Sequence, residues 1–372
     1  MADRRVRGNV ERSYSPASQC TSARLVKIFF ESSILLERRW YPIIDVIMLF
    51  VEDSRHALAP ETSDSILTSE WLKERPLDTR ELVRLSITGR SYDDLVDKTS
   101  VTLDADCRRG GRVDISSFNT YVHPLDAILF LSTPFQVIVE NEWFDGGFVL
   151  WMAKALGFDR LVTAYRQGRF VFRHAGGKDM LTRSAAVLSG GVWPRRDAAY
   201  ERALRLWACV LIDNDARYPG DDPNQAIVTE VTPYVTFVHQ LRRRSIESYI
   251  PAEKLRRFNS APEFARKVNA LFRLEENQRI HYDMKRGFRH DRDDPPSKAS
   301  YVANPAVTSQ ERELFNSVSE IDWQTLTNGF GRGISRIYVD EQYRPNSNDN
   351  AVVDAADKQE ILYLIKSIYE RI

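Results

Sequence analysis

Three acidic residues follow two apolar, β-rich stretches in the middle of the chain, and their type and spacing suit metal binding. Glu140 follows residues 135–139, and Asp213 and Asp215 follow the apolar stretch 206–212. The carboxyl ends of parallel strands face one crevice, so these acids are expected to meet there. Side chains two apart in an extended segment point the same way, so Asp213 and Asp215 should act together. Grouped carboxylates repel unless a cation neutralises them, which predicts Mg²⁺, or alternatively Mn²⁺.

A structural explanation of the same acids stands beside this one, because acids commonly end strands and begin helices. A lone Asp-x-Asp motif is a weak signal. The order along the chain strengthens it: a strand ending in Glu140, then a Gly-Gly turn at 176–177, then Asp213-Asn-Asp215. Glu142 and Asp145 lie close to Glu140, and we expect them to begin a helix rather than to bind metal.

Alternating strands and helices are predicted around these acids. The β-rich stretches are 135–140, 169–173, 206–212 and 234–238, and helical stretches cover 145–156 and 179–188. This alternation predicts an α/β fold with a parallel sheet. Helical spacing of apolar residues from 24 to 55 predicts one or two helices, and residues beyond 251 are mostly helical in pattern. The expected division is a flexible basic tail (1–24), a mostly helical N-terminal domain (25–130), a catalytic α/β domain (131–258) and a C-terminal helical region (259–372).

The motifs together resemble the TOPRIM domain superfamily, in particular OLD-type and phage-defence-associated TOPRIM nucleases. The resemblance covers residues 131–290 and rests on the segments VIVENEWFDG (137–146), HAGGK (174–178) and LIDND (211–215). It implies a TOPRIM-like parallel sheet flanked by helices, with mainly helical additions at both ends. It also implies that Glu140, Asp213 and Asp215 are the metal ligands and catalytic acids. Asn141 departs from the family, which usually has Gly there.

Two further segments extend the resemblance towards the C-terminus. The segment 239–251 carries Glu247 where related nucleases supply another acid, although Ser245 stands where they often have Asp. The segment 282–287 carries Lys285, which would neutralise charge on the phosphate being transferred. Glu247 would be a further metal ligand. The structural alternatives are a helix N-terminal acid for Glu247 and a solvated surface cation for Lys285.

Basic residues beside these segments are candidates for contacting nucleic acid. Arg242, Arg243 and Arg244 form a run, and His174 and Lys178 flank the Gly-Gly turn. Such clusters suit a phosphate backbone. Charge runs are more often solvated faces, and an exposed histidine in a turn is an equally good explanation of His174.

The whole chain sets limits on its class. Its 372 residues allow two or three domains, and 52 basic residues balance 52 acidic ones, so nucleic-acid binding would depend on local charge. Cys20, Cys107 and Cys209 form no CxxC pair, which argues against a zinc site or disulfide framework and fits the cytoplasm. The longest apolar run near the N-terminus, 41–51, is too short to span a bilayer, so no membrane association is expected.

The sequence thus predicts a metal-dependent nuclease acting on DNA or RNA, which could be a regulated anti-phage effector. No Walker-type loop occurs, so nucleotide-driven control would come from an ATPase or sensor partner, and a homo-oligomer is a further possibility. Two alternatives stay open. One is a non-catalytic TOPRIM-fold module for assembly or nucleic-acid binding. The other is a haloacid-dehalogenase-like phosphatase, against which Arg217 stands where that family has Thr or Val.

Overall fold

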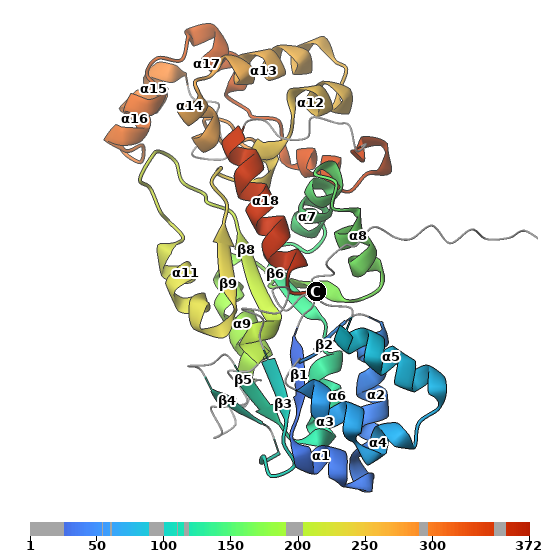
Figure 1. The fold of residues 1–372 in the computed structure, drawn as a ribbon. Coiled ribbons are helices and arrows are strands. Elements are labelled where there is room, and N and C mark those ends of the chain that lie inside the picture. Colours follow the sequence, from blue (N-terminus) through green and yellow to red (C-terminus); the bar gives the residue numbers. More distant parts are fainter. Residues whose placement is uncertain are drawn as a thin grey trace, which may run out of the picture.

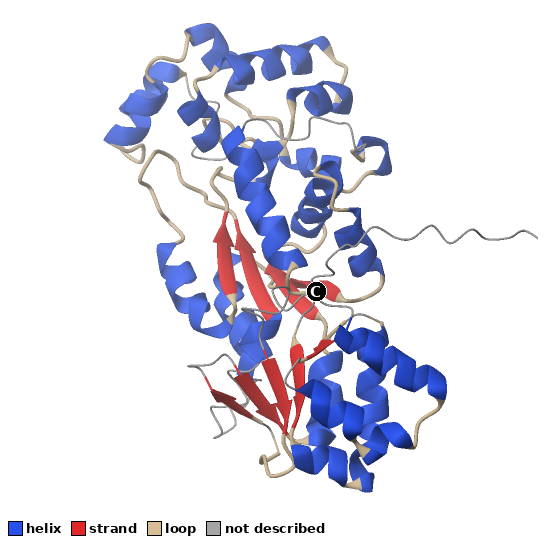
Figure 2. Cartoon of the chain, in the orientation of Figure 1, coloured by secondary structure: helices blue, strands red, loops and turns tan. Residues whose placement is uncertain are grey.

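Two sheets, each accompanied by helices, and a helical region make up the molecule (Figures 1 and 2). The computed structural model describes residues 26–53, 55–59, 62–88, 100–109, 111–114, 119–190, 204–289, 297–345 and 355–372. The basic tail expected at 1–24 lies outside these residues. None of the helices in the described ranges is long and apolar enough to cross a membrane.

The N-terminal region contains a sheet with strand order β2-β1-β3-β5-β4. Its strands are parallel except β4, which runs antiparallel to β5. The strands are β1 Lys27–Phe30, β2 Ala57–Leu58, β3 Ser100–Leu103, β4 Arg112–Asp114 and β5 Asn119–Val122. Helices in this region are α1 Ser32–Leu36, η1 Arg38–Trp40, α2 Tyr41–Glu52, α3 Ser63–Thr68, α4 Glu70–Lys73, α5 Leu77–Thr88 and α6 Pro124–Ser132.

The N-terminal region, expected to be mostly helical, also contains a five-stranded sheet, so its architecture is mixed α/β. The strands here have two to four residues. Such short runs show no alternating pattern that separates them from helix. The stretch 27–30 was assigned to a helix because its apolar residues also fit helical spacing, whereas the helix that follows at 41–52 agrees with the pattern.

The second sheet has strand order β7-β6-β8-β9 and is parallel throughout, as the sequence predicted. Its strands are β6 Phe135–Val139, β7 Phe170–His174, β8 Ala208–Ile212 and β9 Phe237–Gln240. β8 is buried along its whole length, in line with its continuous apolar sequence. β9 begins later than expected because the 3₁₀ turn η6 Thr232–Tyr234 occupies the preceding residues.

Helices cover both faces of this second sheet, and alternate strand residues face alternate layers. Val137 and Leu211 belong to the core formed with α7 Phe144–Ala155, α8 Asp159–Arg166 and α18 Ala355–Tyr369. Ile138, Val210 and Ile212 belong to a separate core with α9 Leu181–Gly190 and α11 Gln225–Val231. Short 3₁₀ turns precede α9 and β8 at η4 Lys178–Met180 and η5 Arg205–Trp207. The second sheet is thus the middle layer of three (Figure 1).

The C-terminal region is helical, as expected, and shares one apolar core with α7. It begins after η7 Ile246–Tyr249 and comprises α12 Ala252–Phe258, α13 Pro262–Arg273, α14 Glu276–His281, α15 Lys298–Ala303, α16 Ser309–Phe315, α17 Glu320–Leu326, η8 Arg332–Tyr338 and η9 Glu341–Tyr343. The chain then returns as α18, which runs back beside the second sheet (Figure 1).

Candidate functional site

Glu140 and Asp213 follow the ends of neighbouring parallel strands. β6 and β8 pair directly, with Ile138 opposite Val210. The two acids therefore lie at the same edge of one sheet, as the sequence argument requires. Glu140 is exposed, whereas Asp213 is half-buried.

The charges of several neighbouring side chains act on the Asp213 carboxyl group. Its Oδ1 accepts a hydrogen bond from the backbone N–H of Ile246 at 3.1 Å. Burial raises the pKa of the Asp213 carboxyl well above its usual value, and the negative charges of Asp145 and Glu247 raise it further, while Lys285 opposes the shift. Asp213 thus holds its negative charge at a cost that a nearby cation would relieve.

Asp145 belongs to the same group, although the sequence suggested only a helix-start role. Its Oδ2 accepts a hydrogen bond from the Asn141 backbone N–H at 2.8 Å, and Asn141 Oδ1 in turn accepts from the Trp143 N–H at 3.0 Å. These bonds satisfy free N–H groups at the start of α7. Burial raises the pKa of Asp145 to about 7, opposed by the Asn141 hydrogen bond and reinforced by the charge of Glu140. Asp145 therefore both fixes the turn that precedes α7 and belongs to the acidic group.

Glu247 and Lys285 form the buried side of the group. Glu247 has no exposed surface, and its Oε1 accepts hydrogen bonds from Lys285 Nζ at 3.0 Å and from Ser335 Oγ at 2.5 Å. Its Oε2 is buried with no hydrogen-bond partner among the described residues. Burial would lower the pKa of Lys285, but the carboxylates of Glu247 and Asp213 raise it on balance. The Lys285 side chain is 37% exposed, but its ammonium group is paired with Glu247 and lies among the acids.

Asp215 is engaged by a basic partner of its own, although its charge also raises the pKa of Asp213. Its backbone has φ of 58°, in the left-handed region, and its N–H donates to the Arg244 carbonyl at 2.8 Å. Its carboxylate pairs with Lys178 and accepts a hydrogen bond from Asn224 Nδ2 at 3.3 Å. The expectation that Asp213 and Asp215 act as an extended pair is therefore wrong, because the chain is not extended at Asp215. Lys178, expected to contact nucleic acid, is engaged by this carboxylate.

The described residues contain no three Asp, Glu, His or Cys side chains close enough together to hold a metal ion in this conformation. The predicted ligand set of Glu140, Asp213, Asp215 and Glu247 is thus not preassembled. The groups that act on one another electrostatically are Asp145, Asp213 and Glu247, with Lys285 among them; Glu140 also raises the pKa of Asp145, and Asp215 that of Asp213. His174 ends β7 and is exposed.

The three consecutive arginines are engaged within the protein. Arg242 Nη2 and Arg243 Nε each lie 2.7 Å from a carboxylate oxygen of Asp357. Arg243 and Asp357 have side-chain exposures of 1% and 0%. Arg244 donates to the His281 carbonyl at 3.0 Å and lies 3.5 Å from the Asp283 carboxylate. The predicted contact of Arg243 with nucleic acid is therefore wrong, because its side chain is buried in the interior and cannot reach a ligand.

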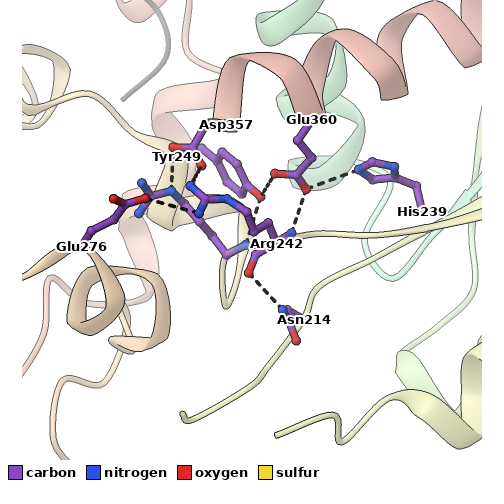
Figure 3. Close-up of polar contacts among 8 residues, drawn as sticks. Asn214, His239, Arg242, Tyr249, Glu276, Asp357 and Glu360 are labelled. Carbon is purple, nitrogen blue, oxygen red and sulfur yellow. Dashed lines mark hydrogen bonds and ion pairs between the residues drawn. The ribbon is translucent and has the colours of Figure 1, made fainter. Parts of the chain in front are cut away.

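Polar contacts of Arg242 and Tyr249, drawn in Figure 3, help to fix the backbone segment that leads to Glu247. Glu360 on α18 accepts hydrogen bonds from the Arg242 N–H and from the Tyr249 hydroxyl, both at 2.7 Å, and lies 3.4 Å from His239. The Arg242 carbonyl accepts from the Asn214 side chain at 3.0 Å. The segment is thus held on one side by α18 and on the other by the Asp213–Asp215 turn.

A cavity of about 370 Å³ lies between α7, α8 and η8. Its walls include Trp143, Leu150, Val162 and Phe172, and Glu142 lies at its edge. Glu142 is two residues beyond Glu140, so the cavity adjoins the acidic edge but contains none of the predicted ligands.

Comparison of the chain with models of known protein families, with curated proteins and with solved structures finds no match.

Proposed function

We propose that this chain is a divalent-cation-dependent hydrolase of phosphodiester bonds in DNA or RNA, of the TOPRIM type. The observation that carries the proposal is the acidic group at the carboxyl edge of β6 and β8. Asp145, Asp213 and Glu247 come from three different segments and act on one another there. Like charges are brought together in this way when a site handles cations or protons, and shifted pKa values concentrate at such sites.

The donor set suits a hard divalent cation. The pKa values of Asp145 and Asp213 are raised, so these carboxylates resist carrying charge without a counter-ion. Glu247 Oε2 is a buried oxygen without a described hydrogen-bond donor, which is unusual in a protein interior. Mg²⁺ prefers carboxylate oxygens, and Asp213, Glu247 and Asp145 would hold it after drawing closer together than they lie in the described conformation, with Glu140 and Asp215 at the margin. When bound, such an ion polarises a phosphoryl oxygen and lowers the pKa of water.

The chain's own residues would orient the substrate and balance its charge. Lys285 carries a positive charge held by Glu247, 3.0 Å away, and is suited to facing a phosphate oxygen. Asp213 is fixed by its hydrogen bond from Ile246 at 3.1 Å. Glu140 is exposed at the same edge, where it can accept a proton from water. Control by an ATPase or sensor protein remains part of the proposal, since the chain has no Walker-type loop.

One observation favours a second function. Lys285 already lies among the three acids, so an internal cation neutralises part of their charge. A non-catalytic module for assembly or nucleic-acid binding would have this arrangement without needing a metal. The two functions differ in their response to Mg²⁺.

The test is cleavage of mixed DNA and RNA by the purified chain in Mg²⁺ or Mn²⁺, with chelator as the blank. We expect Asp213→Asn to lower cleavage by about a hundredfold or more, since it removes a ligand and its charge. Asp222→Asn is the matched control: the same chemical change on an exposed carboxylate that bonds Gln240.

Binding of the cation is measured separately from cleavage, by thermal unfolding. Mg²⁺ should raise the unfolding temperature of the wild type, by mass action, and leave that of Asp213→Asn unchanged. Undiminished cleavage by Asp213→Asn would reject the mechanism. A wild type that neither cleaves nor responds to either cation would favour the non-catalytic module.

A further inference from the structure

A second cavity, of about 150 Å³, is lined by four arginines. We call it the arginine pocket and define it by Arg217, Arg244, Arg286 and Arg289. A cavity of about this volume accommodates a molecule the size of benzene, so a single phosphate group fits and a nucleoside does not. The pocket lies between the β8 exit, the segment before η7 and the turn after α14.

The arginines outnumber the acids that face them. Asp283 and Glu311 are the acidic residues lining the pocket. Arg217 pairs with Asp221 at 3.1 Å, and Arg244 lies 3.5 Å from Asp283. Neither Arg286 nor Arg289 forms an ion pair with a described residue. Arg289 Nε is in addition buried with no hydrogen-bond partner among those residues. A buried guanidinium N–H without an acceptor is costly, and an anion in the pocket would satisfy it.

The backbone that presents these arginines is held rigidly. Gly287, between Arg286 and Phe288, has φ of 72° and packs directly against the backbone of 326–329. Phe288 stacks on Trp323 with ring centroids 3.8 Å apart. The planar guanidinium group matches the oxygens of a phosphate in pairs, and a fixed frame keeps several such groups aimed at one point.

The arginine pocket shares its backbone segments with the acidic group. Arg217 is two residues beyond Asp215, and Arg286 follows Lys285 directly. The Arg244 carbonyl accepts the hydrogen bond from the Asp215 N–H at 2.8 Å. A ligand in the pocket therefore contacts side chains from the same backbone segments that carry Asp215 and Lys285.

We propose that the arginine pocket binds a phosphate group of the nucleic-acid substrate, next to the bond that is cut. The placement on the substrate rests on the proposed function, whereas binding of phosphate itself does not. A terminal phosphate monoester and an internal diester share this chemistry.

The first experiment measures binding of inorganic phosphate to the full chain by calorimetry, in chelator and at low salt. The variant is Arg286→Gln with Arg289→Gln, and the control is Arg256→Gln with Arg257→Gln, two exposed arginines on α12. Both doubles remove the same charge. Hydrogen bonds to charged groups account for a loss of about tenfold or more in affinity for the pocket variant. The control should stay within about twofold of the wild type, because Arg256 and Arg257 do not line the pocket.

The second experiment compares 5′-phosphorylated and 5′-hydroxyl oligonucleotides of one sequence. For a terminal monoester, loss of the 5′ phosphate weakens wild-type binding and leaves the pocket variant unaffected. For an internal diester, both oligonucleotides bind the wild type alike, and the pocket variant shows a salt dependence lower by about 0.7 in logarithmic slope. Equal phosphate binding by wild type and pocket variant, or none by the wild type, overturns the proposal. If the wild type binds phosphate but cleaves no nucleic acid, the arginine pocket is supported and the hydrolase function is rejected. If it cleaves nucleic acid but binds no phosphate, the hydrolase function is supported and the arginine pocket is rejected.

Discussion

Replacing Asp357 by alanine should destabilise the protein strongly, because two guanidinium groups depend on its carboxylate. Arg243 lies 2.7 Å from it with 1% of its side chain exposed, and Arg242 lies 2.7 Å from it with 32% exposed. Removing one partner of a buried ion pair costs about 3–5 kcal/mol, since the remaining charge cannot reach water. Arg242 can rehydrate, so its loss adds no more than about 1 kcal/mol. We expect the free energy of unfolding to fall by about 4 kcal/mol.

The assay is equilibrium unfolding in urea, with hydrogen exchange of residues 241–250 to locate the effect. Glu74→Ala is the control: its partner Arg38 lies 2.6 Å away, but the two side chains are 80% and 37% exposed, so the loss should not exceed about 1 kcal/mol. Asp357→Leu combined with Arg243→Met should recover most of the loss, because an apolar pair of similar volume replaces a buried ion pair without penalty. A loss below about 1 kcal/mol for Asp357→Ala would refute this reasoning.

Three further changes should have distinct outcomes. Burial lowers the pKa of His56 from 6.5 to about 4, so the folded protein binds a proton at His56 less readily than the unfolded chain does. The contribution of neutral His56 to the free energy of unfolding is therefore full above pH 6.5 and is lost as the pH falls towards 4. Between pH 6.5 and 5 this loss is about 2 kcal/mol, and urea titrations should show it removed in His56→Gln. Gly287→Ala should lower the unfolding temperature much more than Gly331→Ala: both have positive φ, but only at Gly287 would a Cβ collide with neighbouring backbone, and equal shifts would contradict this. In chelator, Asp213→Asn should raise the unfolding temperature, increasingly so as the pH rises, because its raised pKa makes the ionised form unfavourable; a fall would count against the electrostatic account.

The second sheet was predictable from sequence because its strands are strongly apolar and separated by clear helices. β8 is the best case, since seven apolar residues in a row match a strand buried on both faces. The first sheet was not, because its strands are short and its core depends on contacts far apart in the chain. His56, for instance, bonds to the Leu131 carbonyl at 2.8 Å across 75 residues.

The sequence was enough to predict which strand ends carry the site, but not which side chains contact one another there. The pairing of β6 with β8 put Glu140 and Asp213 at one edge, as expected. The left-handed backbone of Asp215 could not be foreseen, because non-glycine residues seldom adopt it. The role of Arg243 was hidden for a different reason: its partner Asp357 is 114 residues away, and a run of arginines looks the same whether buried or exposed.

The attachment of the Glu247 segment to α18 also has a consequence for the newly made chain. Arg243 is translated 114 residues before Asp357, and Arg242 118 residues before Glu360. At synthesis rates of about 5–20 residues per second, roughly ten seconds separate them. During that interval the arginines have no α18 to bind, and burying them would be unfavourable. The Glu247 segment therefore reaches its final contacts only after α18 has been synthesised.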